Sequence, residues 1–149
     1  MPKCKDVMTA NPVCCEPGDS ISLVADIMKQ ENVGSVPVVD ARGSNRLVGI
    51  VTDRDLVVKV VAGGRGLEGA TVRDAMTSNP ASCREEDDVD EAMNVMEDRQ
   101  VRRVPILDAS GRVSGIIAQA DVATRVNRDD RTGELVEAIS DSNSGSARR

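Results

Sequence analysis

The chain of 149 residues contains no histidine and no phenylalanine, tyrosine or tryptophan. Without aromatic rings it lacks the platforms on which single-stranded nucleic acid stacks, and its net charge of −6 gives no excess of basic groups for a phosphate backbone. We therefore expect no nucleic-acid partner. Any base that this protein binds must lie between aliphatic side chains.

Long apolar segments are also missing. No run of eighteen apolar residues occurs, and the opening residues 1–6 (MPKCKD) lack the apolar stretch of a signal peptide. We expect no membrane partner and a cytoplasmic location.

The four cysteines, Cys4, Cys14, Cys15 and Cys83, include no Cys-x-x-Cys pair. Because histidine is absent, a zinc site would need thiolates gathered from dissimilar places along the chain. We expect reduced, structural cysteines and no metal site; a metal or redox role is the alternative.

An internal duplication organises the sequence. A shift of 68 residues places residues 6–12 (DVMTANP) on 74–80 (DAMTSNP), and residues 36–41 (VPVVDA) on 104–109 (VPILDA). After the extra Ser44 and Asn45 the shift becomes 66, so that Gly49 matches Gly115 and Asp55 matches Asp121. The chain therefore contains two copies of one sequence repeat.

Each copy predicts the order β-α-β-β-α. In the first copy we expect strands at 13–15, 35–39 and 47–51, a turn at 40–43, and a second helix at 53–61. Asp19 or Ser20 caps the first helix, and Asp87 or Asp88 caps its counterpart. The apolar stripes of these two helices follow helical spacing and predict core positions at Ile21, Val24, Ala25, Met28, Val89, Ala92, Met93 and Met96.

The domain boundaries follow from the duplication. We expect repeat 1 at 3–62, a glycine-rich linker at 63–70, repeat 2 at 71–127, and a partly disordered tail at 128–149. Within this tail, residues 132–139 predict one short helix, and the Ser/Gly-rich residues 140–149 predict disorder.

The segment 49–55 (GIVTDRD) runs from a strand directly into a helix. A hydroxyl at Thr52 beside unpaired backbone N–H groups suits a phosphate oxygen, and the carboxylate of Asp55 suits ribose hydroxyls. The same spacing also predicts a capping box that only starts the helix. The second copy keeps Asp121 but has Ala118 in place of the threonine, which favours a ligand role for a carboxylate without its capping partner.

Two arginines, Arg102 and Arg103, precede Val104 in the second copy, where the first copy has Gly34 and Ser35. Guanidinium groups offer phosphates a fork of hydrogen-bond donors. The alternative is an exposed pair that solvates the strand end or pairs with Glu97 and Asp98.

Taken together, the Met-Thr-x-Asn-Pro opening, the Val-Pro-h-h-Asp strand (h, an apolar residue) and the Gly-h-h-Thr-x-x-Asp ending resemble the CBS domain family. The resemblance covers residues 3–127 and is strongest to small bacterial proteins that consist of one CBS pair (Bateman module). It implies a mixed α/β (α+β) fold, with two tandem β-α-β-β-α repeats related by a pseudo-twofold axis and two clefts for adenine nucleotides.

Carried onto this chain, the resemblance makes the two clefts unequal. The first cleft would combine a hydroxyl, a carboxylate, two guanidinium groups and a base-binding wall; its residues are Thr52, Asp55, Arg102, Arg103, Ile50, Val51, Ala81 and Ser82. The second, weaker cleft would contain Asp121, Ala118, Ser35 and Gly34. Arg54 and Lys59 are further candidate phosphate contacts, with a solvated helix face as the alternative role.

The resemblance implies a regulatory module that senses AMP, ADP, ATP or NAD, forms a homodimer and signals to a protein target that the sequence does not identify. No catalytic residues, catalytic cofactor or metal are expected, and we expect no enzyme activity. The alternatives are a ligand-free interaction scaffold and a cysteine-based redox sensor.

Overall fold

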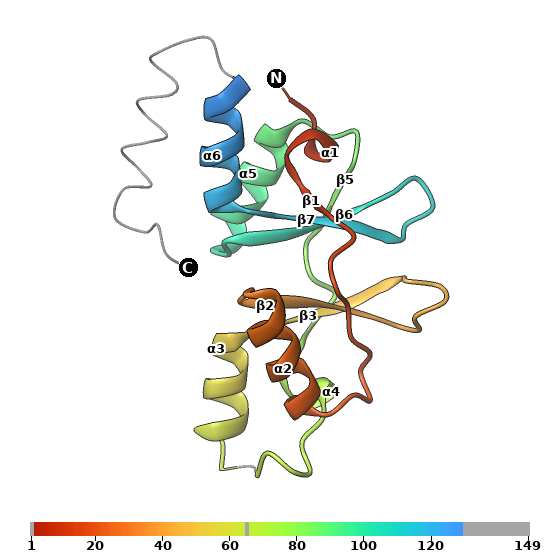
Figure 1. Cartoon of the computed structure of the whole chain (residues 1–149), viewed down its shortest axis with the longest axis vertical. Helices are drawn as coiled ribbons and strands as arrows, with labels where there is room; N and C mark the ends of the chain where they lie inside the picture. Colours follow the sequence, from red (N-terminus) through yellow and green to blue (C-terminus); the bar gives the residue numbers. More distant parts are fainter. Residues whose placement is uncertain (1, 65, 130–149) are drawn as a thin grey trace. The chain divides into compact units, whose positions relative to one another are not determined.

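The computed structural model describes residues 2–64 and 66–129, which form two compact units (Figure 1). Of the described residues, unit 1 comprises 2–11, 81–110 and 114–129, and unit 2 comprises 12–64, 66–80 and 111–113. The helix expected at 132–139 and the disorder expected at 140–149 lie outside the described residues. The boundaries predicted for the repeats, linker and tail describe the duplication along the chain and stay predictions.

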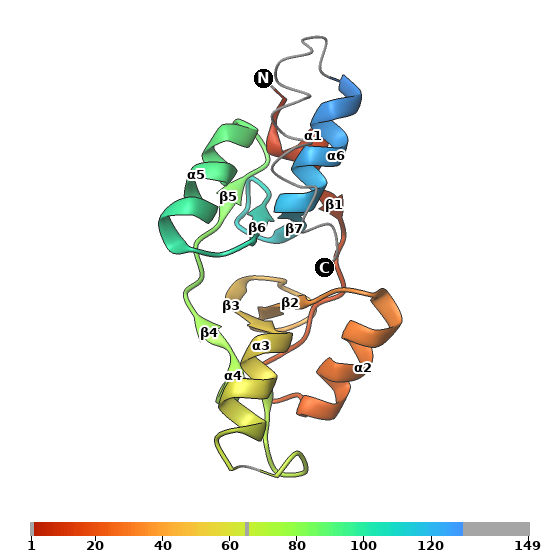
Figure 2. The same ribbon diagram turned by 90° about the vertical axis from the view of Figure 1, so that its left-hand side faces the viewer.

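Unit 2 is built on a three-stranded antiparallel sheet in the order β2-β3-β4. Its strands are β2 (Ser35–Val39), β3 (Leu47–Thr52) and β4 (Thr77–Ser78). The helices lie on one face of this sheet (Figure 2); they are α2 (Ile21–Glu31), α3 (Asp53–Asp55), its continuation η1 (Leu56–Val61) and α4 (Val72–Ala75). The core between helices and sheet consists of small and branched side chains: Cys15, Ile21, Val24, Val36, Val38, Val51, Val60, Ala70, Val72 and Ala75.

Unit 1 has a four-stranded sheet in the order β1-β7-β6-β5. The strands are β1 (Thr9–Ala10), β7 (Val113–Ala118), β6 (Arg103–Leu107) and β5 (Cys83–Arg84), and β5 runs parallel to β6. The helices are α1 (Cys4–Val7), α5 (Val89–Arg99) and α6 (Gln119–Asp129). Its core is again aliphatic, with Cys4, Val7, Cys83, Val89, Ala92, Met96, Val104, Ile106, Ile117 and Val122.

The predicted helices α2 and α5 are confirmed, and the structure decides between the alternative cap residues that the sequence left open. Ser20, and not Asp19, caps α2, because its Oγ accepts a hydrogen bond from the Leu23 N–H at 3.1 Å. Asp88 occupies the cap position of α5 without a side-chain cap hydrogen bond. The prediction that Ala25 is a core residue is wrong: it is exposed, and the buried face of α2 is completed by Ile27 and Met28.

The predicted strands and second helix are confirmed in outline. Residues 35–39 form β2, and the strand expected at 47–51 extends through Thr52. The strand expected at 13–15 is present only as an isolated bridge between Cys15 and Val38. The helix expected at 53–61 begins as one α-helical turn and continues as a π-helix, η1.

Each unit includes the opening segment of the other repeat, which the sequence did not predict. In unit 1, Thr9 of repeat 1 pairs with Ile116 of repeat 2, and in unit 2, Thr77 of repeat 2 pairs with Ile50 of repeat 1. The methionine of each Met-Thr motif packs on the glycine of the strand it joins. A Cβ atom built on Gly115 would lie 2.2 Å from the Met8 Sδ atom, so only glycine leaves room for this contact.

Candidate functional site

The junction of β3 and α3 holds Thr52 and Asp55 in a reciprocal capping box. The Thr52 Oγ1 atom accepts from the Asp55 N–H at 3.1 Å, and the Asp55 Oδ2 atom accepts from the Thr52 N–H at 2.9 Å. The capping role that the sequence left open is therefore real. Both side chains can still bind a ligand, because a hydroxyl that accepts one hydrogen bond can still donate its proton, and a carboxylate has about four acceptor sites.

The segment before β2 lies directly beside this junction in unit 2. The Asp53 N–H donates to the Gly34 carbonyl at 3.0 Å, and Ser35 is the cross-strand partner of Thr52. The Ser35 side chain is 5% exposed, and its Oγ atom has no hydrogen-bond partner within the described structure. A buried hydroxyl without a partner is unfavourable, and it suits contact with a polar group that the protein itself does not supply.

Unit 1 contains the matching junction with different side chains. The Gln119 N–H donates to the Arg102 carbonyl at 2.8 Å, the counterpart of the bond between Asp53 and Gly34. The Asp121 Oδ2 atom accepts from the Ala118 N–H at 3.4 Å. The threonine hydroxyl is absent here, as the sequence shows, but the aspartate half of the capping box remains, because the backbone N–H of Ala118 needs no threonine side chain.

The structure thus groups the predicted site residues by unit. It brings Thr52 and Asp55 together with Gly34 and Ser35. In unit 1 it brings the Arg102 carbonyl to the junction that contains Ala118 and Asp121, and Arg103 begins β6, the strand next to β7. The predicted combination of Thr52 and Asp55 with the two arginines joins residues of different units and stays a prediction.

The residues predicted to contact the base differ in how much side chain they offer. Ile50 and the pair Ala81 and Ser82 are half-buried, whereas the Val51 side chain is fully buried in the core of unit 2. Val51 can therefore offer a ligand only its backbone, while Ile50 offers apolar side-chain surface.

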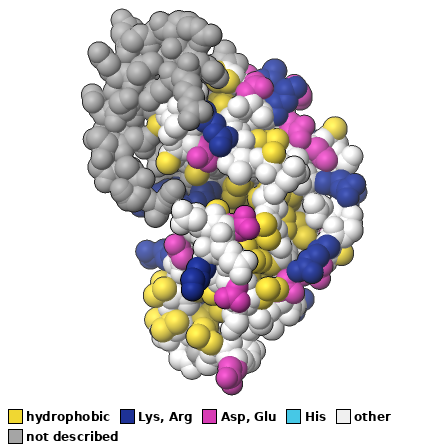
Figure 3. Space-filling view, in the orientation of Figure 1, with side chains coloured by type: hydrophobic (Ala, Val, Ile, Leu, Met, Phe, Trp, Pro, Cys, Tyr) yellow, Lys and Arg dark blue, Asp and Glu magenta, His cyan; other side chains and the backbone are white. Residues whose placement is uncertain are grey.

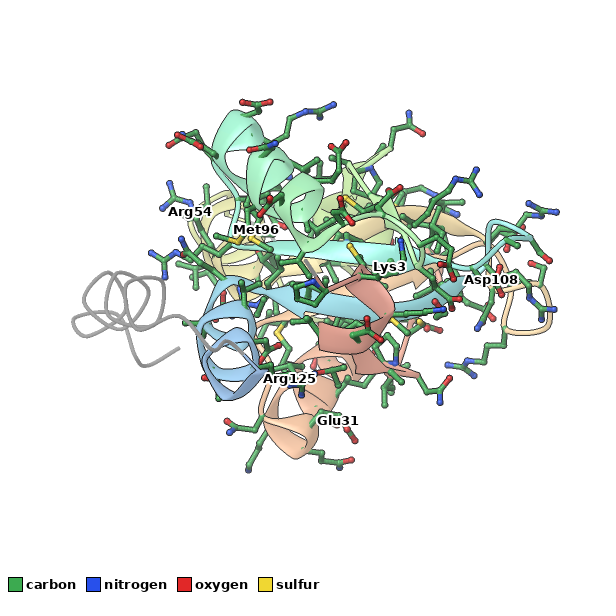
Figure 4. All side chains as sticks on the ribbon, turned by 90° about the horizontal axis from the view of Figure 1, so that it is seen from above. Lys3, Glu31, Arg54, Met96, Asp108 and Arg125 are labelled. Atoms are coloured by element: carbon green, nitrogen blue, oxygen red, sulfur yellow. The ribbon has the colours of Figure 1, made fainter. Side chains whose placement is uncertain are left out.

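Two cations follow Thr52 on the same helical segment. Arg54, labelled in Figure 4, is exposed. The Lys59 Nζ atom lies 3.4 Å from the Asp55 Oδ1 atom and donates to the Ala75 carbonyl at 3.1 Å. The sequence reasoning missed this second contact. The spacing of four residues between Asp55 and Lys59 could have revealed the ion pair, since it places the two side chains on one helix face.

All four cysteines are free, and Cys4, Cys15 and Cys83 are buried. The Cys4 thiol donates to the Asp88 carbonyl at 3.7 Å. Interaction with Cys83 and burial raise the pKa of Cys4, whereas interaction with Cys4 lowers the pKa of Cys83. Burial raises the pKa of Cys14 to about 11 and that of Cys15 to about 12. These three elevated values keep thiols protonated at neutral pH and favour the structural role.

Within residues 2–64 and 66–129, no three potential ligands among histidine, cysteine, aspartate and glutamate lie together in a way that could hold a metal ion. Over the same residues, no helix combines the length and apolar character needed to cross a bilayer.

The chain is similar along most of its length to a small bacterial protein. It is 38% identical over 141 residues to the uncharacterized protein YlbB of Bacillus subtilis, which covers 95% of this chain and 93% of YlbB.

Three solved structures are also similar. Hypoxic Response Protein I with two coordinated zinc ions has 31% identity and a TM-score of 0.74, over 82% of this chain and 97% of that chain. CBSX2, a CBS-pair protein from Arabidopsis thaliana, in complex with AMP has 25% identity and a TM-score of 0.76, over 88% and 100%. The CBS domain pair of MJ0100 with 5-methylthioadenosine and S-adenosyl-L-methionine has 25% identity and a TM-score of 0.74, over 87% and 99%.

A family model provides the last comparison. The model for the CBS domain matches residues 4–62 and again residues 72–128. Each match contains its own strand–helix junction with an aspartate, Asp55 in the first match and Asp121 in the second. Because the two matches together span most of the sequence, this chain belongs to the CBS domain family.

Proposed function

We propose that this protein is a regulatory module that binds an adenine nucleotide, such as AMP, ADP, ATP or NAD, and catalyses no reaction on it. The observation that carries the proposal is the junction at Thr52 and Asp55, where a hydroxyl, a carboxylate and a helix N-terminus meet. CBSX2 and the MJ0100 pair, which share the fold, were solved with adenosine-containing ligands. That shared chemistry supports an adenosine ligand here.

The carboxylate of Asp55 is the proposed ribose contact. Its side chain is 16% exposed, so that it is partly desolvated, and its Oδ2 atom is already oriented by the Thr52 N–H. A carboxylate held in this way accepts hydrogen bonds from two adjacent hydroxyls at a small entropic cost. In the proposed complex the Thr52 hydroxyl donates to phosphate.

Arg102 and Arg103 are the proposed phosphate contacts of the same ligand, as the resemblance to the CBS family implies. Guanidinium groups bind phosphate through two parallel N–H donors, which neither Gly34 nor Ser35 provides at the matching positions of the first repeat. The second cleft, with Asp121, Ala118, Ser35 and Gly34, would therefore bind a phosphorylated ligand more weakly. The unpartnered Ser35 hydroxyl lies beside Thr52 in unit 2 and suits a polar ligand group at that junction.

Isothermal titration against AMP, ADP, ATP, NAD and S-adenosylmethionine tests the proposal. We expect at least one adenine nucleotide to bind. Replacing Asp55 or Arg103 with alanine should weaken binding by about 1–3 kcal/mol, the usual effect of losing a hydrogen bond to a charged group. Asp121→Ala is the matched control and should weaken binding less. Equal losses at Asp55 and Asp121 would refute the inequality of the clefts, and binding of none of the five compounds would refute the function.

The signal is proposed to pass through association of two copies and then to a protein partner in the cytoplasm. Unit 2 exposes an apolar group on η1 consisting of Val57, Val58 and Val61, which are 48–61% exposed (Figure 3). Exposed apolar side chains gathered on one helix are typical of an interaction surface. Light scattering with and without AMP measures the association, and a monomer under both conditions would contradict a homodimer.

A second candidate function is a thiol-based sensor, which the presence of two free thiols, Cys4 and Cys83, in the core of unit 1 favours. For such a sensor, peroxide treatment would change the oligomeric state, and AMP would have no effect. The same light-scattering experiment, repeated under reducing and oxidising conditions, distinguishes the two functions.

A further inference from the structure

Lys59 links two parts of unit 2 that are far apart in the sequence. Its ammonium group lies 3.4 Å from the Asp55 Oδ1 atom and donates to the carbonyl of Ala75, the last residue of α4, at 3.1 Å. An ammonium group has three N–H donors, so that one lysine can serve both acceptors at once. Asp55 belongs to the first repeat, whereas α4 opens the second.

The same link to a short helix occurs in unit 1 with a different cation. Arg125, labelled in Figure 4, matches Lys59 under the shift of 66 residues and donates from α6 to the carbonyls of Val7 and Met8, the latter at 2.7 Å. Val7 is the last residue of α1 and matches Ala75 under the shift of 68. A contact made twice, with lysine once and arginine once, is a built feature of the fold.

The carboxylate contact distinguishes the two links. In the described part of the chain, Lys59 pairs with Asp55, but Arg125 forms no ion pair with Asp121. The Asp55 carboxylate is thus held at both oxygens, by the Thr52 N–H on Oδ2 and by Lys59 on Oδ1. Among the residues that the structure describes, the Ala118 N–H alone holds Asp121.

We propose that Lys59 is a positioning residue that orients Asp55 for the ribose and connects the occupancy of that site to α4 and β4 of the second repeat. The inference rests on the proposed function, because it takes Asp55 as the ribose contact. A ribose that binds the carboxylate restrains Asp55, Asp55 restrains Lys59, and Lys59 restrains the carbonyl end of α4. The segment 72–78 is therefore the part of unit 2 that responds to the ligand.

Titration with adenosine and with AMP tests the positioning role. Lys59→Met keeps the length of the side chain and removes its charge, and it should weaken the binding of both compounds equally, by about 3- to 10-fold for a half-exposed charged contact. Lys59→Arg should restore binding, because a guanidinium group keeps the positive charge and the N–H donors that the Asp55 carboxylate and the Ala75 carbonyl accept. In an Asp55→Ala background, Lys59→Met should have no further effect. Arg54→Met, which removes a neighbouring charge outside these contacts, is the control for adenosine binding.

Several results would overturn this assignment. A loss for AMP but not for adenosine would make Lys59 a phosphate contact. Additive losses with Asp55→Ala, or failure of Lys59→Arg to restore binding, would show that Lys59 does not act through Asp55.

Hydrogen exchange separates this inference from the proposed function. The Met76 N–H donates to the Val72 carbonyl at the end of α4, next to the carbonyl that Lys59 contacts. AMP should slow its exchange in the wild type and in Lys59→Arg, and not in Lys59→Met. If AMP binds but Met76 exchange is unchanged, the connection is wrong while the proposed function stands. If no adenine compound binds, the proposed function fails and this inference fails with it.

Discussion

Replacing Gly115 with alanine tests how the opening segment of repeat 1, with Met8 and β1, packs on strand β7 of repeat 2. The new Cβ atom would lie 2.2 Å from the Met8 Sδ atom and 2.7 Å from its Cγ atom, far inside the usual contact distance of about 3.5–4 Å. Met8 must therefore move, and overpacking of this kind costs about 1–3 kcal/mol. Replacing a glycine within a strand by alanine by itself stabilises the fold by about 0.5–1 kcal/mol. We therefore expect Gly115→Ala to lower the free energy of unfolding by about 1–2 kcal/mol in total.

Combining Gly115→Ala with Met8→Ala tests whether the loss of stability comes from this one contact. The three nearest atoms that the new methyl group meets belong to the Met8 side chain, and Met8→Ala removes the two closest, Sδ and Cγ, leaving the Cβ atom at 3.1 Å. Met8→Ala alone loses part of a half-buried side chain, at about 1–2 kcal/mol. We expect the double variant to be no less stable than Met8→Ala, which gives a coupling of at least about 1 kcal/mol.

Gly49 provides the matched comparison in unit 2. A Cβ atom there would lie 2.8 Å from the Met76 Sδ atom but also 2.9 Å from the carbonyl oxygen of Thr77, which belongs to the paired strand β4. Met76→Ala removes only the first clash, so that rescue of Gly49→Ala should be incomplete. Urea unfolding of the six variants measures these differences. Additive losses for Met8 and Gly115 would refute the packing argument.

Three further predictions concern single residues. Ser20→Ala should lower the free energy of unfolding by about 0.5–2 kcal/mol through loss of the cap on α2, and Asp88→Ala, which removes no cap hydrogen bond, should cost less in the same urea titration. Asn32 ends α2 with φ of 57°, so Asn32→Val should destabilise the fold by about 1–2 kcal/mol while Asn32→Gly stays near the wild type. Burial raises the pKa of Cys14 from 9.0 to about 11, so that its thiolate fraction at pH 8 is about 100-fold lower than that of an ordinary cysteine. The rate of Cys14 alkylation, measured by mass spectrometry, should be lower by the same factor at pH 8 and should rise as the pH is increased to 11. A Cys14 that reacts as fast as in the urea-unfolded chain would contradict the last expectation.

The local elements of the fold were predictable because their signals lie within a few residues of one another. The β-branched runs in 35–39 and 47–52 and the helical spacing after Ser20 and Asp88 depend on neighbours along the chain. Ala25 shows where this reasoning fails. It lies on the predicted apolar stripe, but which part of a stripe is covered depends on the segments that pack there.

For the candidate site as well, some contacts were predictable from the sequence and others were not. The junction at Thr52 and Asp55 was visible in the sequence as a spacing of three residues, including the capping box that the structure contains. The contact of Lys59 with Ala75 was not visible, because sixteen residues separate them and no periodicity joins them.

The sequence by itself determined the duplication, the order of elements in each repeat and the residues at each strand–helix junction, since these depend on composition and short-range spacing. Only the tertiary structure decided that the opening segment of each repeat completes the sheet of the other, that Gly49 and Gly115 make room for methionines, and that Lys59 joins Asp55 to α4. Such contacts depend on which distant segments meet, and that is settled by packing across the whole unit rather than by any local pattern.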